Sequence, residues 1–359
     1  MSSVTDVVVI GAGQSGLAAA RVLQAHGIGP VVLEAGPEPA GSWPHYYDSL
    51  TLFSPARYSA MPGLGFPGDP SHYPHRDEVA AYLRRYAASL GADIRTHTPV
   101  TAVEARESAG FLVHTTTGQT IHAAGLVAAT GSFGNPHVPA LPGQDHFTGR
   151  QLHVAHYRGP HQHAGERIVV VGGGNSAVQV GYELAQVATV TLATRHRINF
   201  HPQCRGGHDL HYWLVTSGFD LLPPQWLDHY LGDRWVVDTG KYRHALETGQ
   251  MDRRPMFTAF GADGVVWPDG TREQVDTVVF ATGYRPDLDY LRPLGTLDTQ
   301  GMPLHSGGIS ATHPGLVYLG LEFQRSFSSN TLRGVHRDAE HVITPLAAHV
   351  RSAPAAVGL

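Results

Sequence analysis

The chain has 359 residues, of which 42% are apolar and 15% charged, so it is long enough for two hydrophobic cores and too apolar for a disordered chain. Its formal charge is -5 and its basic residues are scattered rather than gathered in a stripe, so nucleic acid is not expected as a partner. Cys204 is the only cysteine, which excludes an internal disulfide and a redox-active cysteine pair.

The N-terminal segment predicts a strand rather than a targeting sequence. It runs from Met1 into an apolar strand, Val7 to Ile10, without the basic start and small-residue cleavage site of a secretory signal. The chain also lacks an uninterrupted run of about 18 apolar residues, the length that a membrane-spanning helix needs. We therefore expect a cytoplasmic protein without a membrane partner. The sequence leaves the oligomeric state open, with a homodimer among the candidates.

The first strand opens a β-α-β unit with a glycine-rich turn. The turn GAGQSG spans 11–16, a helix runs from Leu17 to about His26, and a second strand spans Val31 to Glu34. In such a GxGxxG turn the glycines permit a tight bend, close approach of a pyrophosphate, and packing of helix on strand. The helix start offers N–H groups to phosphates, and Glu34 is placed to accept hydrogen bonds from a ribose diol. The unit predicts a dinucleotide site.

An amphipathic helix and three short strands follow this unit. The helix spans 77–90, and the strands span 111–117, 120–122 and 126–129. The last strand ends in the segment Ala129-Thr130-Gly131.

A second β-α-β unit repeats the first, about 160 residues later. It has a strand from Ile168 to Val171, the turn GGGNSA at 172–177, a helix over 178–188 and a strand from Val190 to Thr194. Two such units predict parallel sheets. Arg195 and His196 stand where the first unit has Glu34, so no carboxylate repels a 2′-phosphate and a guanidinium can bind one. This favours NADPH over NADH, unless Arg195 is only a solvated surface residue.

The rest of the chain continues the duplication and adds an insertion. A hairpin and strand over 265–267 and 275–280 end in Ala281-Thr282-Gly283, which matches the earlier Ala-Thr-Gly segment. Residues 199–260 fit neither unit, and we interpret them as an insertion with short helices that forms a lid over the site. A buried strand from Leu316 to Gly320 and a helix over 331–350 complete the chain. The histidine-rich loop around His161 lacks metal-ligand spacing, so we expect no metal site.

The linker between the two units carries a further motif. It reads Phe147-Thr-Gly149, then His153 and Tyr157, and it resembles the FxGxxxHxxx-aromatic fingerprint of the flavin-containing monooxygenases. Together with the two glycine turns and the segment Phe280 to Tyr284, the resemblance covers nearly the whole chain. The likeness is to the short bacterial members, which lack the additional segments of the longer eukaryotic enzymes.

This resemblance implies an α/β fold with two Rossmann-like domains in a glutathione-reductase-like arrangement. The expected domains are an FAD domain over 1–155 and 285–359 and an NADPH domain over 156–284. The implied activity uses NADPH and O2 to oxygenate a small soft nucleophile (a sulfide, amine or arsenical) or a ketone, through a flavin C4a-hydroperoxide. The protein would hold nicotinamide against flavin and keep water from the peroxide.

The resemblance also assigns residues to the two cofactors. Gly41-Ser42-Trp43 would lie along the flavin, and Asn330-Thr331-Leu332 would present a helix N-terminus to its ring, where it stabilises negative charge. The predicted cofactor-binding residues are Gly11, Gly13, Gln14, Ser15, Gly16, Glu34, Ala35, Gly41, Ser42, Trp43, Thr130, Gly131, Gly172, Gly174, Asn175, Ser176, Ala177, Arg195, His196, Thr282, Gly283, Asn330, Thr331 and Leu332.

One departure from the family concerns Phe53. Where the larger enzymes carry an asparagine that touches the flavin hydroperoxide, this sequence offers a phenyl ring, which cannot donate a hydrogen bond. We expect Phe53 to line the flavin site. His153 is favoured as a structural residue of the linker, so no catalytic acid or base is assigned.

Three other functions compete with the monooxygenase. A flavin disulfide reductase shares the two-domain plan, but it needs two cysteines beside the flavin and the chain has only Cys204. An NADPH oxidase or quinone reductase needs only the same fold without an oxygenated product. A non-catalytic dinucleotide sensor would bind both cofactors without turnover.

Overall fold

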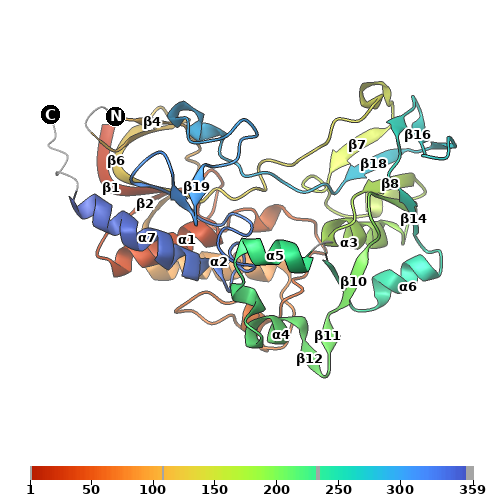
Figure 1. Ribbon diagram of the computed structural model, residues 1–359, viewed down its shortest axis with the longest axis horizontal. Coiled ribbons are helices and arrows are strands. Elements are labelled where there is room, and N and C mark those ends of the chain that lie inside the picture. Colours follow the sequence, from red (N-terminus) through yellow and green to blue (C-terminus); the bar gives the residue numbers. More distant parts are fainter. Residues whose placement is uncertain (1, 107–108, 232–234, 353–359) are drawn as a thin grey trace.

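The computed structural model describes residues 2–106, 109–231 and 235–352. Residues 1, 107–108, 232–234 and 353–359, which fall within the expected domain and insertion ranges, lie outside this description. Two sheets stand at opposite ends of the molecule, and two extended segments connect them (Figure 1). The fold is thus divided into a first unit around the N-terminal sheet and a second unit around the middle of the chain.

The first sheet contains nine strands within the described residues. Its main order is β19-β20-β21-β6-β1-β2-β3, and β4 and β5 extend from β6 as an antiparallel ribbon. β1 pairs in parallel with both β2 and β6. The strands are β1 (Ser2–Ile10), β2 (Val31–Leu33), β3 (Asp93–Arg95), β4 (Val100–Ala105), β5 (Phe111–Thr115), β6 (Thr120–Ala128), β19 (His305–Ser306), β20 (Ile309–Ser310) and β21 (Leu316–Tyr318).

Both faces of β1 are buried over Val7–Ile10, which explains the unbroken apolar run in this half of the strand. Val7 and Val9 belong to the core beneath the three helices α1 (Gln14–Ala25), α2 (Arg76–Leu90) and α7 (Val335–Ser352). Val8 and Ile10 point to the other core, under β4, β5 and the 3₁₀ helix η6 (Asp289–Leu294). Figure 1 shows the three helices together along one side of this sheet.

β6 corrects the prediction of two strands at 120–122 and 126–129. It is one strand over nine residues, because it pairs with β1 along its length. The small residues in its middle signalled a break in the sequence, but they are explained by packing against α7. A Cβ atom on Gly125 would lie 2.8 Å from Val350 and 2.9 Å from Leu346.

The second sheet is parallel throughout, in the order β14-β9-β8-β18-β7. Helix α3 (Asn175–Leu184) connects β8 to β9, as the second glycine-turn unit predicts. β7 belongs to this sheet although its residues were expected in the first domain. The strands are β7 (Arg150–His153), β8 (Arg167–Val171), β9 (Thr189–Thr194), β14 (Asp252–Pro255) and β18 (Thr277–Phe280).

The expected strand over 275–280 is confirmed as β18, which begins two residues later than predicted and is preceded by a separate strand. Its predecessor β17 (Arg272–Gln274) pairs with β16 (Gly264–Val266) in a small antiparallel sheet that also contains β15 (Ala259–Phe260). The strand β18 begins at Thr277, where the chain enters the parallel sheet. A change of pairing partner separates the two, and the apolar pattern alone does not reveal it.

The insertion contains short helices, as predicted, and also short strands. β10 (Asn199–Pro202) pairs in parallel with β13 (Trp235–Asp238), and β11 (Cys204–Arg205) forms a hairpin with β12 (His208–Asp209). β14 then returns the chain to the second sheet beside β9. The helical segments of the insertion are α4 (Leu210–Thr216), η5 (Phe219–Leu221), α5 (Pro224–Leu231) and α6 (Lys241–Glu247). The other 3₁₀ helices are η1 (Trp43–His45), η2 (Ala56–Tyr58), η3 (Gln144–His146) and η4 (His161–His163).

Two chain crossings join the units, and they run antiparallel to each other. The N–H of His137 donates to Gly283 O at 2.9 Å, and the N–H of Arg285 donates to Asn135 O at 3.0 Å. Asp287 N–H donates to Gly131 O at 2.9 Å. This two-stranded connection, seen between the sheets in Figure 1, holds both crossings in a fixed register.

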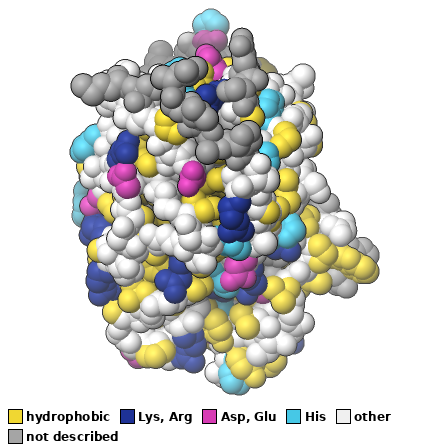
Figure 2. Space-filling model, turned by 90° about the vertical axis from the view of Figure 1, so that its left-hand side faces the viewer, with side chains coloured by type: hydrophobic (Ala, Val, Ile, Leu, Met, Phe, Trp, Pro, Cys, Tyr) yellow, Lys and Arg dark blue, Asp and Glu magenta, His cyan; other side chains and the backbone are white. Residues whose placement is uncertain are grey.

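Helix α7 begins later than the sequence indicates. The expected start was Thr331, but the helix proper begins at Val335 and is preceded by a turn in which Val335 N–H donates to Thr331 O at 3.0 Å. Asn330 is therefore not the residue that caps this helix. Among the described residues, no helix combines the length and the apolar content needed to cross a bilayer. Charges of both signs are interspersed over the face shown in Figure 2.

Candidate active site

The first glycine turn is a close-packed bend that only glycine can form. Gly11 has φ +99°, and a Cβ atom there would lie 2.6 Å from Ala129 O. A Cβ atom on Gly16 would lie 1.8 Å from Gly11 O. Gly13 is the N-cap of α1, makes no side-chain cap, and no acidic residue occupies the first turn. The helix start is thus suited to bind an anion.

Glu34 fastens this turn to the end of β2. Its side chain is buried, and its two carboxylate oxygens accept hydrogen bonds from Ala12 N–H at 2.7 Å and from Gly36 N–H at 2.8 Å. Each carboxylate oxygen has a second lone pair. The carboxylate therefore holds the backbone of the turn and can still accept from a hydroxyl. Ala35, the next residue, is exposed.

Gln14 connects three segments that are distant in sequence. Its Oε1 accepts from Trp43 Nε1 at 2.9 Å, and its Nε2 donates to Asn330 O at 2.6 Å. Gly41, two residues before Trp43, has φ +57°, and a Cβ atom there would lie 2.8 Å from Gly13 Cα. The structure thus brings together the turn, the 41–43 segment and Asn330, which the family resemblance assigned to one site.

The remaining residues predicted near the first turn have varied environments. Thr130 Oγ1 donates to Asp287 O at 2.6 Å, and so ties the Ala-Thr-Gly segment to the return crossing. Ser15 is buried, and Ser42 and Gly131 are half-buried. Thr331 Oγ1 donates to Ser328 O at 2.7 Å, and Leu332 is buried in the core of the first unit.

The second glycine turn repeats the packing of the first. Gly172 has φ +135°, and a Cβ atom there would lie 2.5 Å from Ala281 O, as Gly11 packs on Ala129 O. Gly174 is the N-cap of α3, without a side-chain cap or an acidic residue in the first turn. No atom lies within 4 Å of a Cβ built on Gly174. The next residues are the half-buried Ser176 and the fully buried Ala177.

Asn175 binds the insertion rather than pointing to open space. Its Nδ2 donates to Trp235 O at 3.3 Å, and its Oδ1 accepts from Val237 N–H at 2.9 Å. The side chain therefore links the start of α3 to strand β13.

The end of β9 carries a cationic group of residues. Arg195 and His196 are exposed there. Arg253, on the neighbouring strand β14, donates from Nε to Thr194 Oγ1 at 2.7 Å and from Nη2 to His196 O at 3.0 Å. Arg253 is a residue that the sequence analysis missed. It fixes the backbone that carries Arg195.

His153 is held inside the connection between the units. It is 3% exposed, its Nε2 lies 3.0 Å from Gly283 O, and its Nδ1 accepts from Ala155 N–H at 3.1 Å. Burial lowers the pKa of His153 to about 4, although the bond to Gly283 O opposes this. The ring is neutral with its proton on Nε2, which fits the predicted structural role. Thr282, beside Gly283, donates from Oγ1 to His137 O.

A run of aromatic rings leads from one unit to the other. The centroids are 5.6 Å apart for Trp43 and Tyr46, 4.6 Å for Tyr46 and Phe133, and 5.4 Å for Phe133 and Tyr284. His153 meets Tyr284 edge-on at 5.0 Å. Burial raises the pKa of Tyr284, so its phenol stays protonated. These rings form a largely apolar wall that runs from Trp43, which is bonded to Gln14 of the first glycine turn, to Tyr284 in the return crossing.

Phe53 lies where the first unit meets the insertion. Its ring is 40% exposed and stacks on His211 of α4, with centroids 5.9 Å apart; Tyr58 stacks on the same imidazole. His211 Nδ1 lies 2.8 Å from Asp209 Oδ1, and Tyr73 OH donates to Asp209 Oδ2 at 2.6 Å. Burial raises the pKa of Asp209, but the hydrogen bonds from His211 and Tyr73 outweigh it and lower the pKa overall.

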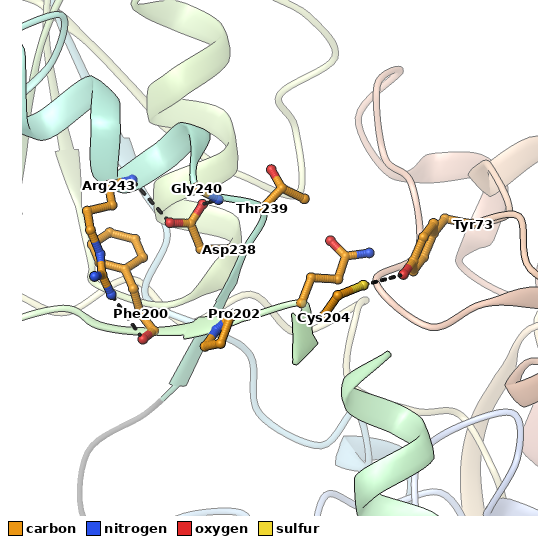
Figure 3. Close-up of a pocket in the computed structure, with 9 residues that line it drawn as sticks. Tyr73, Phe200, Pro202, Cys204, Asp238, Thr239, Gly240 and Arg243 are labelled. Carbon is orange, nitrogen blue, oxygen red and sulfur yellow. Dashed lines mark hydrogen bonds between the residues drawn. The ribbon is translucent and has the colours of Figure 1, made fainter. Parts of the chain in front are cut away.

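A pocket of about 500 Å³ opens beside this contact (Figure 3). Tyr73 faces it from the first unit, while Phe200 and Arg243 face it from the insertion. Tyr73 OH lies 3.8 Å from the sulfur of Cys204, the exposed single cysteine. The sequence predicts the insertion but not its contacts with Phe53, Tyr58 and Tyr73, since these join residues more than 100 positions apart.

Comparison with known proteins gives consistent matches. The sequence model of the pyridine nucleotide-disulphide oxidoreductase family matches residues 8–215. A flavin-containing monooxygenase from Stenotrophomonas maltophilia superimposes with a TM-score of 0.84 at 32% identity, covering 97% of this chain and 99% of that chain. A CzcO-like oxidoreductase of Geobacillus kaustophilus is 31% identical over 97% of this chain and 100% of its own length. The indole-3-pyruvate monooxygenase YUCCA1 of Oryza sativa subsp. japonica is 32% identical over 83% of this chain and 81% of its own.

Proposed function

Because the chain belongs to the pyridine nucleotide-disulphide oxidoreductase family, and within it to the flavin-containing monooxygenases, we propose that it uses FAD and NADPH to oxygenate a small molecule. Membership makes the protein a flavin-dependent enzyme that uses NAD(P)H. The proposal goes further than family membership in three respects: the flavin is FAD, NADPH is preferred over NADH, and the substrate belongs to a stated class.

The observation that carries the proposal is the pair of matching glycine turns. Gly11 packs on Ala129 O and Gly172 packs on Ala281 O in the same way, and both turns open a helix without a side-chain cap. Each turn stands at the carboxyl end of a parallel strand, where nucleotides bind in such folds. The matching turns therefore support two nucleotide sites within one polypeptide.

The residues around the first turn fit FAD. Gly13 and the start of α1 would hold the pyrophosphate, and Glu34 the ribose. Trp43 and the 330–332 strip, both fixed by Gln14, would border the ring. FAD supplies the hydride acceptance and oxygen chemistry that amino-acid side chains lack. The protein's part is to bind, to orient and to exclude water through its aromatic wall.

The residues around the second turn fit NADPH. Gly174 and the start of α3 would hold its pyrophosphate, and Arg195 its 2′-phosphate, with Arg253 holding the Arg195 backbone in place. No carboxylate follows Thr194 to repel that phosphate. We propose the domain division expected from the sequence, an FAD domain over 1–155 and 285–359 and an NADPH domain over 156–284, except that β7 (Arg150–His153) joins the sheet of the NADPH domain.

The proposed substrate is a soft nucleophile, such as a sulfide, amine or arsenical, or a ketone. The test incubates the purified protein with NADPH, O2 and a panel of these compounds, to which indole-3-pyruvate is added because of the YUCCA1 relative. A monooxygenase consumes NADPH and O2 in equal amounts and forms as much oxygenated product. If every compound yields only hydrogen peroxide, the oxygenase proposal fails.

Hydrogen peroxide as the only product would instead indicate an NADPH oxidase or quinone reductase. By the family resemblance, Phe53 takes the place of a hydrogen-bonding asparagine at the flavin, and this favours the alternative, because a phenyl ring offers no hydrogen-bond donor to a peroxide. A protein that binds NADPH but leaves its flavin oxidised is a sensor. A flavin disulfide reductase needs two cysteines beside the flavin, and this chain has only one.

A further inference from the structure

We propose that Asp220 of the insertion is a positioning residue that fixes the 330–332 strip against the flavin. This inference rests on the proposed function, in which that strip borders the flavin ring. Asp220 lies in η5, within the insertion, and the sequence did not indicate a role for it.

Asp220 makes a buried, two-point ion pair with Arg333. Arg333 Nε donates to Asp220 Oδ2 at 2.7 Å and Nη2 donates to Oδ1 at 2.8 Å. The side chains are only 4% and 11% exposed for Asp220 and Arg333. A planar pair of this kind fixes orientation as well as distance.

The same residue binds the other end of the strip. Ser328 Oγ donates to the backbone oxygen of Asp220 at 3.0 Å, and Arg337 Nη2 donates to Ser328 Oγ at 2.9 Å. Residues 328 and 333 bracket 330–332, so one residue of the insertion restrains both ends. Gln14 restrains the middle through Asn330 O.

The insertion is itself anchored to the second glycine turn. Phe219, next to Asp220, stacks on Trp235 with centroids 5.7 Å apart and meets Phe327 at 5.2 Å. Asn175, at the start of α3, binds Trp235 O and Val237 N–H. A continuous set of contacts therefore leads from the second turn through Asp220 to the strip beside the first turn.

The charge balance explains why this contact is sensitive. Arg333 and Arg337 both face Asp220, at 2.7 Å and 3.9 Å. Removing the carboxylate charge leaves the buried Arg333 without its counter-ion, and such a group moves towards water. The strip would then lose its fixed position, and hydride transfer is sensitive to small displacements of the reacting rings.

The test compares Asp220→Asn and Arg333→Lys with Arg84→Lys. Arg84 makes a two-point pair with Glu38 at 2.7 and 2.9 Å, but this pair is partly exposed and joins α2 to the segment after β2 rather than to the strip. In the first two variants, the amide hydrogens of 328–334 should exchange about tenfold faster than in the parent. NADPH should reduce the flavin of these variants about tenfold more slowly, while the NADPH concentration that gives half the maximal rate stays within about twofold of the parent's. Arg84→Lys should match the parent in all three measurements.

Unchanged hydrogen exchange in both insertion-pair variants would overturn the proposal. So would a slower flavin reduction shared equally by Arg84→Lys, which would show a general loss of stability. If Asp220→Asn does not fold, Arg333→Lys, which keeps its positive charge, carries the test alone. A parent protein that takes up no FAD refutes the proposed function. The hydrogen-exchange measurement still shows whether the Asp220–Arg333 pair holds the 330–332 strip.

Discussion

His153 shows how one buried side chain ties the stability of the connection to pH. Its imidazole donates to Gly283 O and accepts from Ala155 N–H, an arrangement that only the neutral ring satisfies. Burial places its folded-state pKa at about 4, below the ordinary 6.5. The unfolded chain therefore binds the proton first as the pH falls.

We predict that the protein loses stability as the pH falls from 6.5 to 4, and that His153→Asn reduces this loss. Asparagine can accept from Ala155 N–H but does not titrate. Chemical unfolding at a series of pH values measures the slope, and His161→Asn, at an exposed histidine, serves as control. A slope that is the same in His153→Asn and in the parent would show that another group causes the pH dependence.

The proposed preference for NADPH over NADH depends on Arg195. We predict that Arg195→Ala raises the Michaelis constant for NADPH about tenfold or more, equivalent to roughly 1.5 to 3 kcal/mol for a lost charge-assisted contact. The constant for NADH should change by less than about twofold, since NADH has no 2′-phosphate. Steady-state kinetics with both cofactors decides this.

The contribution of Arg253 is indirect, through Thr194 and His196. Arg253→Ala should therefore raise the NADPH constant less than Arg195→Ala does. If Arg253→Ala has the larger effect, Arg253 binds the phosphate and Arg195 is the solvated residue.

At the scale of single residues, the sequence predicts what is local. Glu34 and Gln14 were identified because they occupy fixed places in a strand–turn–helix motif. Arg253 and Asp220 were not, because their partners lie 59 and 113 residues away along the chain. A sequence shows the residue type but not which distant segment it meets.

At the scale of elements, the first glycine turn depends on Gly16. We predict that Gly16→Ala removes bound flavin and lowers the free energy of unfolding by about 1–3 kcal/mol, because its Cβ would lie 1.8 Å from a backbone oxygen that cannot move aside. Flavin content after purification and thermal unfolding measure the two effects.

Gly29→Ala is the matched control, since a Cβ there meets nothing within 4 Å. Full flavin content in Gly16→Ala would contradict the assignment of this turn as the first nucleotide site.

Element boundaries were predicted best where a motif marks them. The glycine turns located α1 and α3, although both helices begin three residues earlier than predicted and α3 ends at Leu184 rather than at 188, whereas β6 was divided in two and α7 was started too early. For β6 and α7, a contact with a distant partner decided the boundary. β6 is continuous because it pairs with β1 along its length, and α7 is preceded by the strip that is bound to Asp220. Local propensity does not contain that information.

At the scale of the whole molecule, the duplicated plan and the presence of an insertion were predictable, but the contacts of the insertion were not. Two glycine turns and two Ala-Thr-Gly segments indicated two parallel units, and the structure places each Ala carbonyl against the first glycine of its turn. Residues 199–260 carry no repeat, so their contacts with Phe53, Ser328 and Arg333 emerge only in three dimensions.

The central claim is that one polypeptide holds a flavin where a nicotinamide can reduce it. Rapid mixing of the FAD-loaded protein with NADPH in the absence of oxygen, followed through the visible flavin absorbance, tests this most directly. The account predicts that the absorbance bleaches in a single turnover and returns when oxygen is admitted. A protein that cannot be loaded with FAD, or a flavin that stays oxidised in excess NADPH, would contradict it.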